Sequence, residues 1–134
     1  MKVVIVFFAL VAGISAATLP ESEKTLLKQI HDSCQASPST HVDENLLRHM
    51  TQHSQNPKVK AHMLCMAQGA GMMSHSGVLK MSVIKSKMAM TMHDEHLIDT
   101  TINKCVIQKE DPMETSMDMW MCFMQNNIGY MHAL

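Results

Sequence analysis

The chain has 134 residues, a formal net charge of −1 at pH 7 and four cysteines. This near-neutral balance gives no basic surface for nucleic acid or for an anionic membrane, and we exclude both as partners. Methionine is abundant, with 16 residues, against one Trp, one Tyr and three Phe. We therefore expect a core made mainly of aliphatic and thioether side chains.

Residues 1–17 have the layout of a secretory signal peptide. Lys2 precedes an apolar run from Val3 to Ala12, and small residues at positions 15–17 offer a cleavage site. The run is shorter than the ~20 apolar residues that a membrane-spanning helix requires. We predict a signal peptide over residues 1–17, one secreted, extracellular domain over residues 18–134, and no insertion into a membrane. A buried N-terminal helix is the weaker interpretation of the same run.

Prolines and glycines divide the rest of the chain into short segments with helical periodicity. In chain order we expect helices at about Pro20–Gln35, Asp43–Met50, Pro57–Gln68, Val78–Met90, from Thr91 onward, and Pro112–Asn126. Asn56 and Asp111 each precede a proline, an arrangement that begins a helix. Thr91, followed by Asp94 three residues later, resembles a capping box. Because apolar residues do not alternate with a period of two, we predict an all-α domain.

The four cysteines indicate disulfide bonds. They are too widely spaced for a structural zinc site, and an even number behind a secretory signal is typical of an oxidised domain. Four cysteines allow three pairings, and spacing alone does not select one. The expected helices favour Cys105 with Cys122, because these residues lie on consecutive helices joined by a turn. Cys34 would then pair with Cys65.

A resemblance to a known family rests on the cysteine register and on one stretch of sequence. The stretch runs from Asn56 to Cys65 and continues with Gly71-Met72-Met73 and Gly77-Val78-Leu79. It is similar to the third helix and following loop of the insect odorant-binding proteins, the pheromone and general odorant-binding family. That family normally has six cysteines, and Ala61 and Met113 occupy two of those positions here. The chain therefore resembles the four-cysteine (minus-C) type.

The resemblance implies a compact, disulfide-linked bundle of about six short helices around an apolar cavity. It implies the same pairing, Cys34 with Cys65 and Cys105 with Cys122. It further implies a secreted carrier that binds and solubilises a small hydrophobic ligand, such as an odorant, a pheromone or a lipid-like molecule, without cofactor or catalysis. A role in olfaction is implied less strongly, since four-cysteine proteins also occur in non-sensory secretions. A membrane receptor is a further candidate partner, and we expect a monomer or a weak homodimer.

Nine side chains are our candidates for the cavity wall. They are Met81, Ile84, Met88, Ile98, Ile102, Met117, Met121, Met124 and Tyr130. Methionine is flexible and polarizable, so a Met-rich wall suits ligands of different shape. The competing interpretation is that methionines at helical spacing form ordinary core. Tyr130 and His132 also lie in a short C-terminal tail, which is either a pH-sensitive lid or a frayed terminus.

Two other classes of function remain open from the sequence. Among nine histidines, His49 and His53 are spaced i, i+4, and another pair follows at residues 93 and 96. Such spacings could chelate a metal, although solvated surface histidines explain them more simply. The alternatives to a carrier are therefore a secreted Met/His metal-binding protein and an interaction protein with a vestigial cavity. Catalysis is not indicated, since no common nucleophile, metalloprotease or phosphate-loop motif is present.

Overall fold

The structure is a computed structural model that describes residues 19–130. Its elements are α2 (Glu21–Ala36), α3 (Glu44–Arg48), the 3-10 helix η1 (Met50–Gln52), α4 (Pro57–Gly69), α5 (Met81–Met88), α6 (Glu95–Cys105) and α7 (Pro112–Gln125). Over the described range there is no strand, only an isolated bridge between Met73 and Leu79. The prediction of an all-α fold is confirmed. The signal peptide predicted over residues 1–17 lies outside the described residues and stays a prediction.

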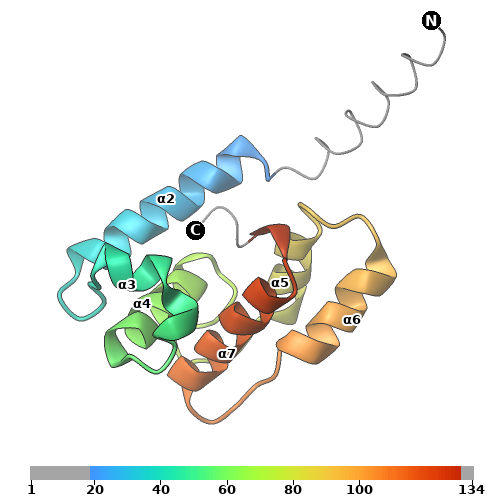
Figure 1. Ribbon diagram of the computed structural model, residues 1–134. Coiled ribbons are helices and arrows are strands. Elements are labelled where there is room, and N and C mark those ends of the chain that lie inside the picture. The colour runs from blue at the N-terminus through green and yellow to red at the C-terminus, as the bar shows by residue number, and fades with distance from the viewer. Residues whose placement is uncertain (1–18, 131–134) are drawn as a thin grey trace, which may run out of the picture.

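Helix α7 lies at the centre of the bundle. It packs most closely against α4, which packs against α2, while α6 contacts both α7 and α5 at the edge of the bundle (Figure 1). The sequence explains this place, because α7 buries side chains on several faces, among them Met119, Trp120 and Phe123. No helix in the described part is long and apolar enough to cross a membrane.

Side-chain caps begin four of the described helices, α3, α4, α6 and α7. The Asn56 carboxamide oxygen accepts from the backbone N–H of Lys58 at 2.9 Å, and the Asp111 carboxylate accepts from that of Met113 at 2.9 Å. Both starts are as predicted. The capping box predicted at Thr91 is wrong, since the cap of α6 is Asp94, which accepts from the N–H groups of residues 96 and 97 at 3.0 and 3.3 Å. A carboxylate also complements the positive end of the helix dipole, which a hydroxyl does not.

Two helices are shorter than predicted. The segment expected at residues 43–50 is a five-residue helix, α3, followed by the separate 3-10 helix η1. The segment expected from Val78 begins only at Met81, because the preceding residues form a turn and a bridge. Gly77 makes this turn with a φ of +91°, a conformation that favours glycine. A Cβ at Gly77 would also lie 2.5 Å from Cγ of Pro112.

Two disulfides join the helices in pairs. Cys34–Cys65 connects α2 to α4 across a sequence separation of 31, and Cys105–Cys122 connects α6 to α7 across a separation of 17. These are the pairs that the expected helices and the family resemblance both favoured. On the chain-entropy model, closing loops of this length stabilises the fold by about 3–4 kcal/mol each.

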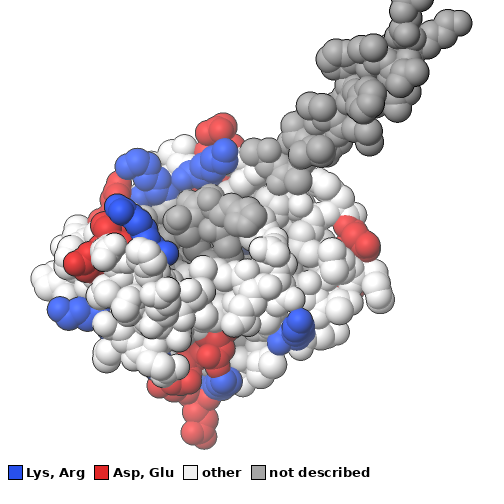
Figure 2. Space-filling view, viewed as in Figure 1, with Lys and Arg blue, Asp and Glu red and all other residues white. Residues whose placement is uncertain are grey.

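Charged side chains form mixed groups on the surface. On the face shown in Figure 2, lysines and arginines lie beside aspartates and glutamates, and wide areas between these groups carry no charge. Several groups contain ion pairs, such as Lys28–Asp32 at 3.2 Å and Lys85–Asp99 at 3.0 Å. Exposed pairs of this kind contribute about 0–1 kcal/mol each. The fold therefore depends mainly on its core and on the two disulfides.

Candidate functional site

A cavity of about 490 Å³ lies among α2, α3, α4, α7 and the residues that follow α7. Its lining combines apolar side chains with a smaller number of polar side chains. The lining residues are His31, Glu44, Leu47, Arg48, Met50, His62, Met63, Met66, Met124, Asn127 and Ile128. Binding sites for small molecules commonly have volumes of about 300–1,000 Å³. The cavity is thus large enough for a small amphipathic molecule.

The nine side chains predicted to form the cavity wall do not lie together around this cavity. Met124 lines the cavity, and the other eight do not. Ile84, Met88, Ile98, Met117 and Tyr130 are buried in the core, Ile102 and Met121 are partly buried against it, and Met81 is 48% exposed. The cavity lies toward the N-terminal helices, whereas most candidates lie on α5, α6 and α7. For the buried candidates, the interpretation as ordinary core fits their positions.

Sequence reasoning missed the contribution of α4. His62, Met63 and Met66 lie within about one turn of this helix, and all three are buried and line the cavity. A signal was present, because a histidine inside a nearly continuous apolar segment needs a partner for its ring nitrogens. That segment predicts a helix buried on more than one face, but it does not show that a cavity adjoins it.

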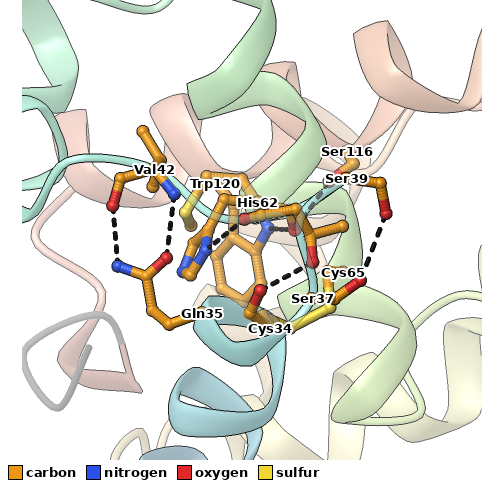
Figure 3. Close-up of a disulfide and its surroundings, with 11 residues drawn as sticks. Cys34, Gln35, Ser37, Ser39, Val42, His62, Cys65, Ser116 and Trp120 are labelled. Carbon is orange, nitrogen blue, oxygen red and sulfur yellow. Dashed lines mark hydrogen bonds between the residues drawn. A yellow bond between two sulfur atoms is a disulfide. The ribbon is translucent and has the colours of Figure 1, made fainter.

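Helix α7 fixes the position of α4 beside the cavity. The indole Nε1–H of Trp120 donates to the backbone carbonyl of Met63 at 2.9 Å, and the Ser116 hydroxyl donates to the same oxygen at 3.2 Å (Figure 3). Both side chains are fully buried. Hydrogen bonds that satisfy buried polar groups are costly to break, so α4 is held firmly in register with α7.

The loop between α2 and α3 is tied to α2 by side-chain hydrogen bonds. The Gln35 carboxamide pairs with the backbone of Val42, donating to its carbonyl at 2.8 Å and accepting from its N–H at 2.9 Å (Figure 3). The Thr40 hydroxyl donates to the Cys34 carbonyl at 2.6 Å. Because Cys34 is bonded to Cys65 of α4, the loop is fixed relative to both helices.

His62 is the buried polar residue of the cavity wall. Its side chain is shielded from solvent, with 1% of the residue exposed, and its Nδ1–H donates to the Thr40 carbonyl at 3.0 Å. Burial is the main cause that lowers the pKa of His62, which favours the neutral ring. A neutral ring protonated at Nδ1 carries a lone pair at Nε2. Among the described residues this Nε2 has no hydrogen-bond partner.

A second histidine, His31, lies beside His62 at the same end of the cavity. The two rings meet edge to face, with centroids 5.2 Å apart. His31 Nε2 is hydrogen-bonded to a carboxylate oxygen of Glu44 at 2.7 Å, and the Gln35 side chain donates to the same oxygen at 2.8 Å. These bonds, that from Gln35 first, lower the pKa of Glu44. Glu44 is therefore ionised and already paired at neutral pH.

The residues after α7 close one side of the cavity and are held by Tyr130. Its hydroxyl donates to the Glu23 carboxylate at 2.6 Å, and the same oxygen lies 2.6 Å from the Lys87 ammonium. Burial, and then the hydrogen bond, raise the pKa of the Tyr130 hydroxyl, so it stays protonated and acts as a donor. The contact fixes the segment that contains Asn127 and Ile128, two residues of the cavity lining.

The histidine pairs considered for metal binding do not share a helix face. His49 is the C-cap of α3 and His53 follows η1, while α6 begins at Glu95, after His93. In the described part of the chain, no group of three or more His, Cys, Asp or Glu residues is arranged to hold a metal ion. The predicted lid contact of His132 lies outside the described residues.

Comparisons with known proteins agree on one family. The model of the PBP/GOBP family matches residues 16–126 of the chain. The B1 protein of Tenebrio molitor is 19% identical over 124 residues, which cover 91% of this chain and 94% of the relative. The B2 protein of Tenebrio molitor is also 19% identical over 124 residues, with 91% and 95% covered. No solved structure matches the chain significantly.

Proposed function

The chain belongs to the PBP/GOBP family of carriers, and we propose that it is secreted and that it binds and solubilises a small hydrophobic ligand in its cavity. The observation that carries this proposal is the cavity of about 490 Å³ whose wall includes four methionines, a leucine and an isoleucine. Such a wall adapts to the shape of an apolar molecule, since methionine changes conformation easily. The two disulfides suit an oxidising extracellular setting.

The size of the cavity is compatible with moderate affinity. A ligand that buries about 300 Å² of apolar surface gains roughly 7 kcal/mol before the cost of its immobilisation. A dissociation constant of about 1 μM corresponds to about −8 kcal/mol, so apolar contact alone should give binding weaker than this. Tighter binding requires a specific polar contact in addition.

Two methionines of α7 offer a matched test of where the ligand binds. Met124 lines the cavity and Met121 does not, although both are partly buried on the same helix. We expect Met124→Phe to reduce the affinity for a fluorescent apolar probe by about tenfold because the larger ring occupies ligand space. Met121→Phe should leave the affinity nearly unchanged.

Two outcomes would overturn this assignment. If Met121→Phe weakens binding and Met124→Phe does not, the ligand does not occupy this cavity. If the oxidised, folded protein takes up no apolar probe at all, the carrier function itself is contradicted, and an interaction protein with a vestigial cavity is favoured.

A further inference from the structure

The buried Nε2 atom of His62 is the feature of the cavity that the fold does not explain. We propose that the cavity selects ligands with a hydroxyl group on an apolar body, and that this hydroxyl donates a hydrogen bond to Nε2 of His62. The ligand class is thus an amphipathic alcohol or phenol. This preference rests on the proposed carrier function and specifies the chemistry of the same site.

The orientation of the His62 ring is fixed by the chain itself. Nδ1 donates to the Thr40 carbonyl at 3.0 Å. The Thr40 hydroxyl in turn donates a hydrogen bond to the Cys34 carbonyl at 2.6 Å. Rotating the ring by half a turn would break the bond to Thr40 and leave a buried carbonyl with one contact fewer. Nε2 is therefore held as an acceptor, and a ligand that satisfies it must bring a donor.

The neighbouring polar side chains do not provide this donor. His31 and Glu44 are bonded to each other at 2.7 Å, and Gln35 uses its amide group on Glu44 and on Val42. No described residue reaches Nε2 of His62. His62 therefore offers an acceptor that is unpaired among the described residues, that is shielded from solvent, and that belongs to a residue lining the cavity.

The rest of the wall suits the apolar part of such a ligand. Met63 follows His62 directly, and Met66 lies one turn further along α4; Met124 of α7 also lines the cavity. A hydroxyl at His62 would leave its alkyl or aromatic body against these methionines. A carboxylate is a poorer match, because it has no proton to give at neutral pH and the ionised Glu44 lies at the same end.

Three ligands of equal chain length separate these possibilities. Binding of decanol, decyl methyl ether and decanoate to the oxidised protein is measured by displacement of one apolar probe. The ether has an oxygen but no donor, so it would leave Nε2 unpaired. We expect decanol to bind about tenfold more tightly than the ether, the range of one well-formed hydrogen bond.

Variants of His62 and of a control histidine test whether the preference for a hydroxyl depends on Nε2 of His62. His62→Phe keeps an aromatic ring without an acceptor, and it should bind decanol and the ether equally. His62→Gln offers both an amide donor for Thr40 and a carbonyl acceptor, and it should keep part of the preference. His41→Gln is the control, because His41 does not line the cavity and its Nδ1 is hydrogen-bonded to the Gln35 carbonyl at 3.1 Å, and it should retain the full difference.

Nitrogen NMR of the wild-type histidines gives a test that does not depend on a variant folding. The His62 ring should be protonated at Nδ1 alone near neutral pH, and its Nε2 resonance should move toward that of a hydrogen-bonded acceptor when decanol is added. The ether should not cause this change. An Nε2 resonance that ignores decanol, despite saturable binding, would overturn the proposal.

Each remaining outcome tests either the preference for a hydroxyl or the carrier function itself. Equal affinity for decanol and the ether in the wild type contradicts the hydroxyl preference and leaves the carrier function intact. Tightest binding of decanoate overturns it in favour of an anion site at Arg48, which also lines the cavity. If none of the three ligands displaces the probe and the probe itself does not bind, the carrier function fails instead.

Discussion

At the scale of single residues, His62 is a titratable group that the fold keeps neutral. Burial lowers its pKa, and the hydrogen bond to Thr40 only partly opposes this effect. In the unfolded chain the ring is exposed and takes up a proton near its ordinary pKa of 6.5. Between that pH and the lower pKa of the folded state, the unfolded chain binds more protons, so acid favours unfolding.

We therefore expect His62 to contribute stability that is complete above about pH 6.5 and is lost as the pH falls through the folded-state pKa. Chemical denaturation of wild type and His62→Gln, at about pH 7.5 and about pH 5, measures this contribution. The free energy of unfolding should fall more steeply with acid in the wild type. The same pH dependence in both proteins would show that His62 is not held neutral.

Tyr130 is the second residue with a long-range role, since it joins the segment after α7 to Glu23 of α2. Tyr130→Phe removes one hydrogen bond to a charged group and keeps the ring, so we expect the free energy of unfolding to fall by about 1.5–3 kcal/mol. Glu23 keeps its contact with Lys87 in this variant. Denaturation and probe binding measure the effect, and unchanged stability would indicate that the contact is not formed in solution.

The same variant bears on the predicted lid. If Tyr130 holds a pH-sensitive lid, loss of its hydroxyl should alter the way probe affinity changes between about pH 7.5 and about pH 5. Affinity that is flat over this range, in both the wild type and Tyr130→Phe, would contradict a lid that opens with acid.

At the scale of helices, the sequence predicts what is local and misses what depends on neighbours. The predicted caps Asn56 and Asp111 are confirmed, because a cap depends only on the next two or three residues. The spacing of Met81 predicts a place in the cavity wall, yet Met81 is 48% exposed. Periodicity identifies the apolar stripe of a helix, but it does not tell which neighbour covers that stripe or where packing leaves a cavity.

The start of α6 provides a direct comparison of two candidate caps. Asp94→Ala removes the carboxylate that accepts from two N–H groups, and we expect it to lower the free energy of unfolding by about 1 kcal/mol. Thr91→Val should be neutral or stabilising, because the buried Thr91 hydroxyl has no hydrogen-bond partner among the described residues. Thermal or chemical denaturation of the two variants shows which residue, Asp94 or Thr91, caps α6. A larger loss in Thr91→Val would restore the capping box at Thr91.

At the scale of the whole molecule, two disulfides hold a bundle whose family usually has three. Ala61 and Met113 replace the cysteines of the missing bridge. They lie on α4 and α7, the pair of helices in closest contact, next to Lys60 and Glu114, whose side chains are 3.0 Å apart. The geometry of the bundle therefore brings the two positions to the same region, although the present residues do not crosslink it.

Restoring this bridge with Ala61→Cys and Met113→Cys should stabilise the oxidised protein by about 3–4 kcal/mol on the chain-entropy model. Ligand selectivity should rise as well, because α4 supplies part of the cavity wall. The oxidised variant with Ala61→Ser and Met113→Ser is the matched control, because it keeps the two native disulfides and cannot form the third. Unchanged melting temperature and selectivity, with the third bridge shown to be closed, would contradict the view that the missing bridge leaves the cavity adaptable.

The central claim is that a small apolar ligand binds among α2, α3, α4 and α7, and methionine methyl groups test it most directly. In NMR spectra of the oxidised protein, labelled at its methionine methyls, we predict saturable one-to-one binding of decanol. Contacts from its alkyl chain should reach Met63, Met66 and Met124, three methionines of the cavity wall. Contacts confined to Met81, Met88 and Met117, or no saturable binding by the folded protein, would contradict this account.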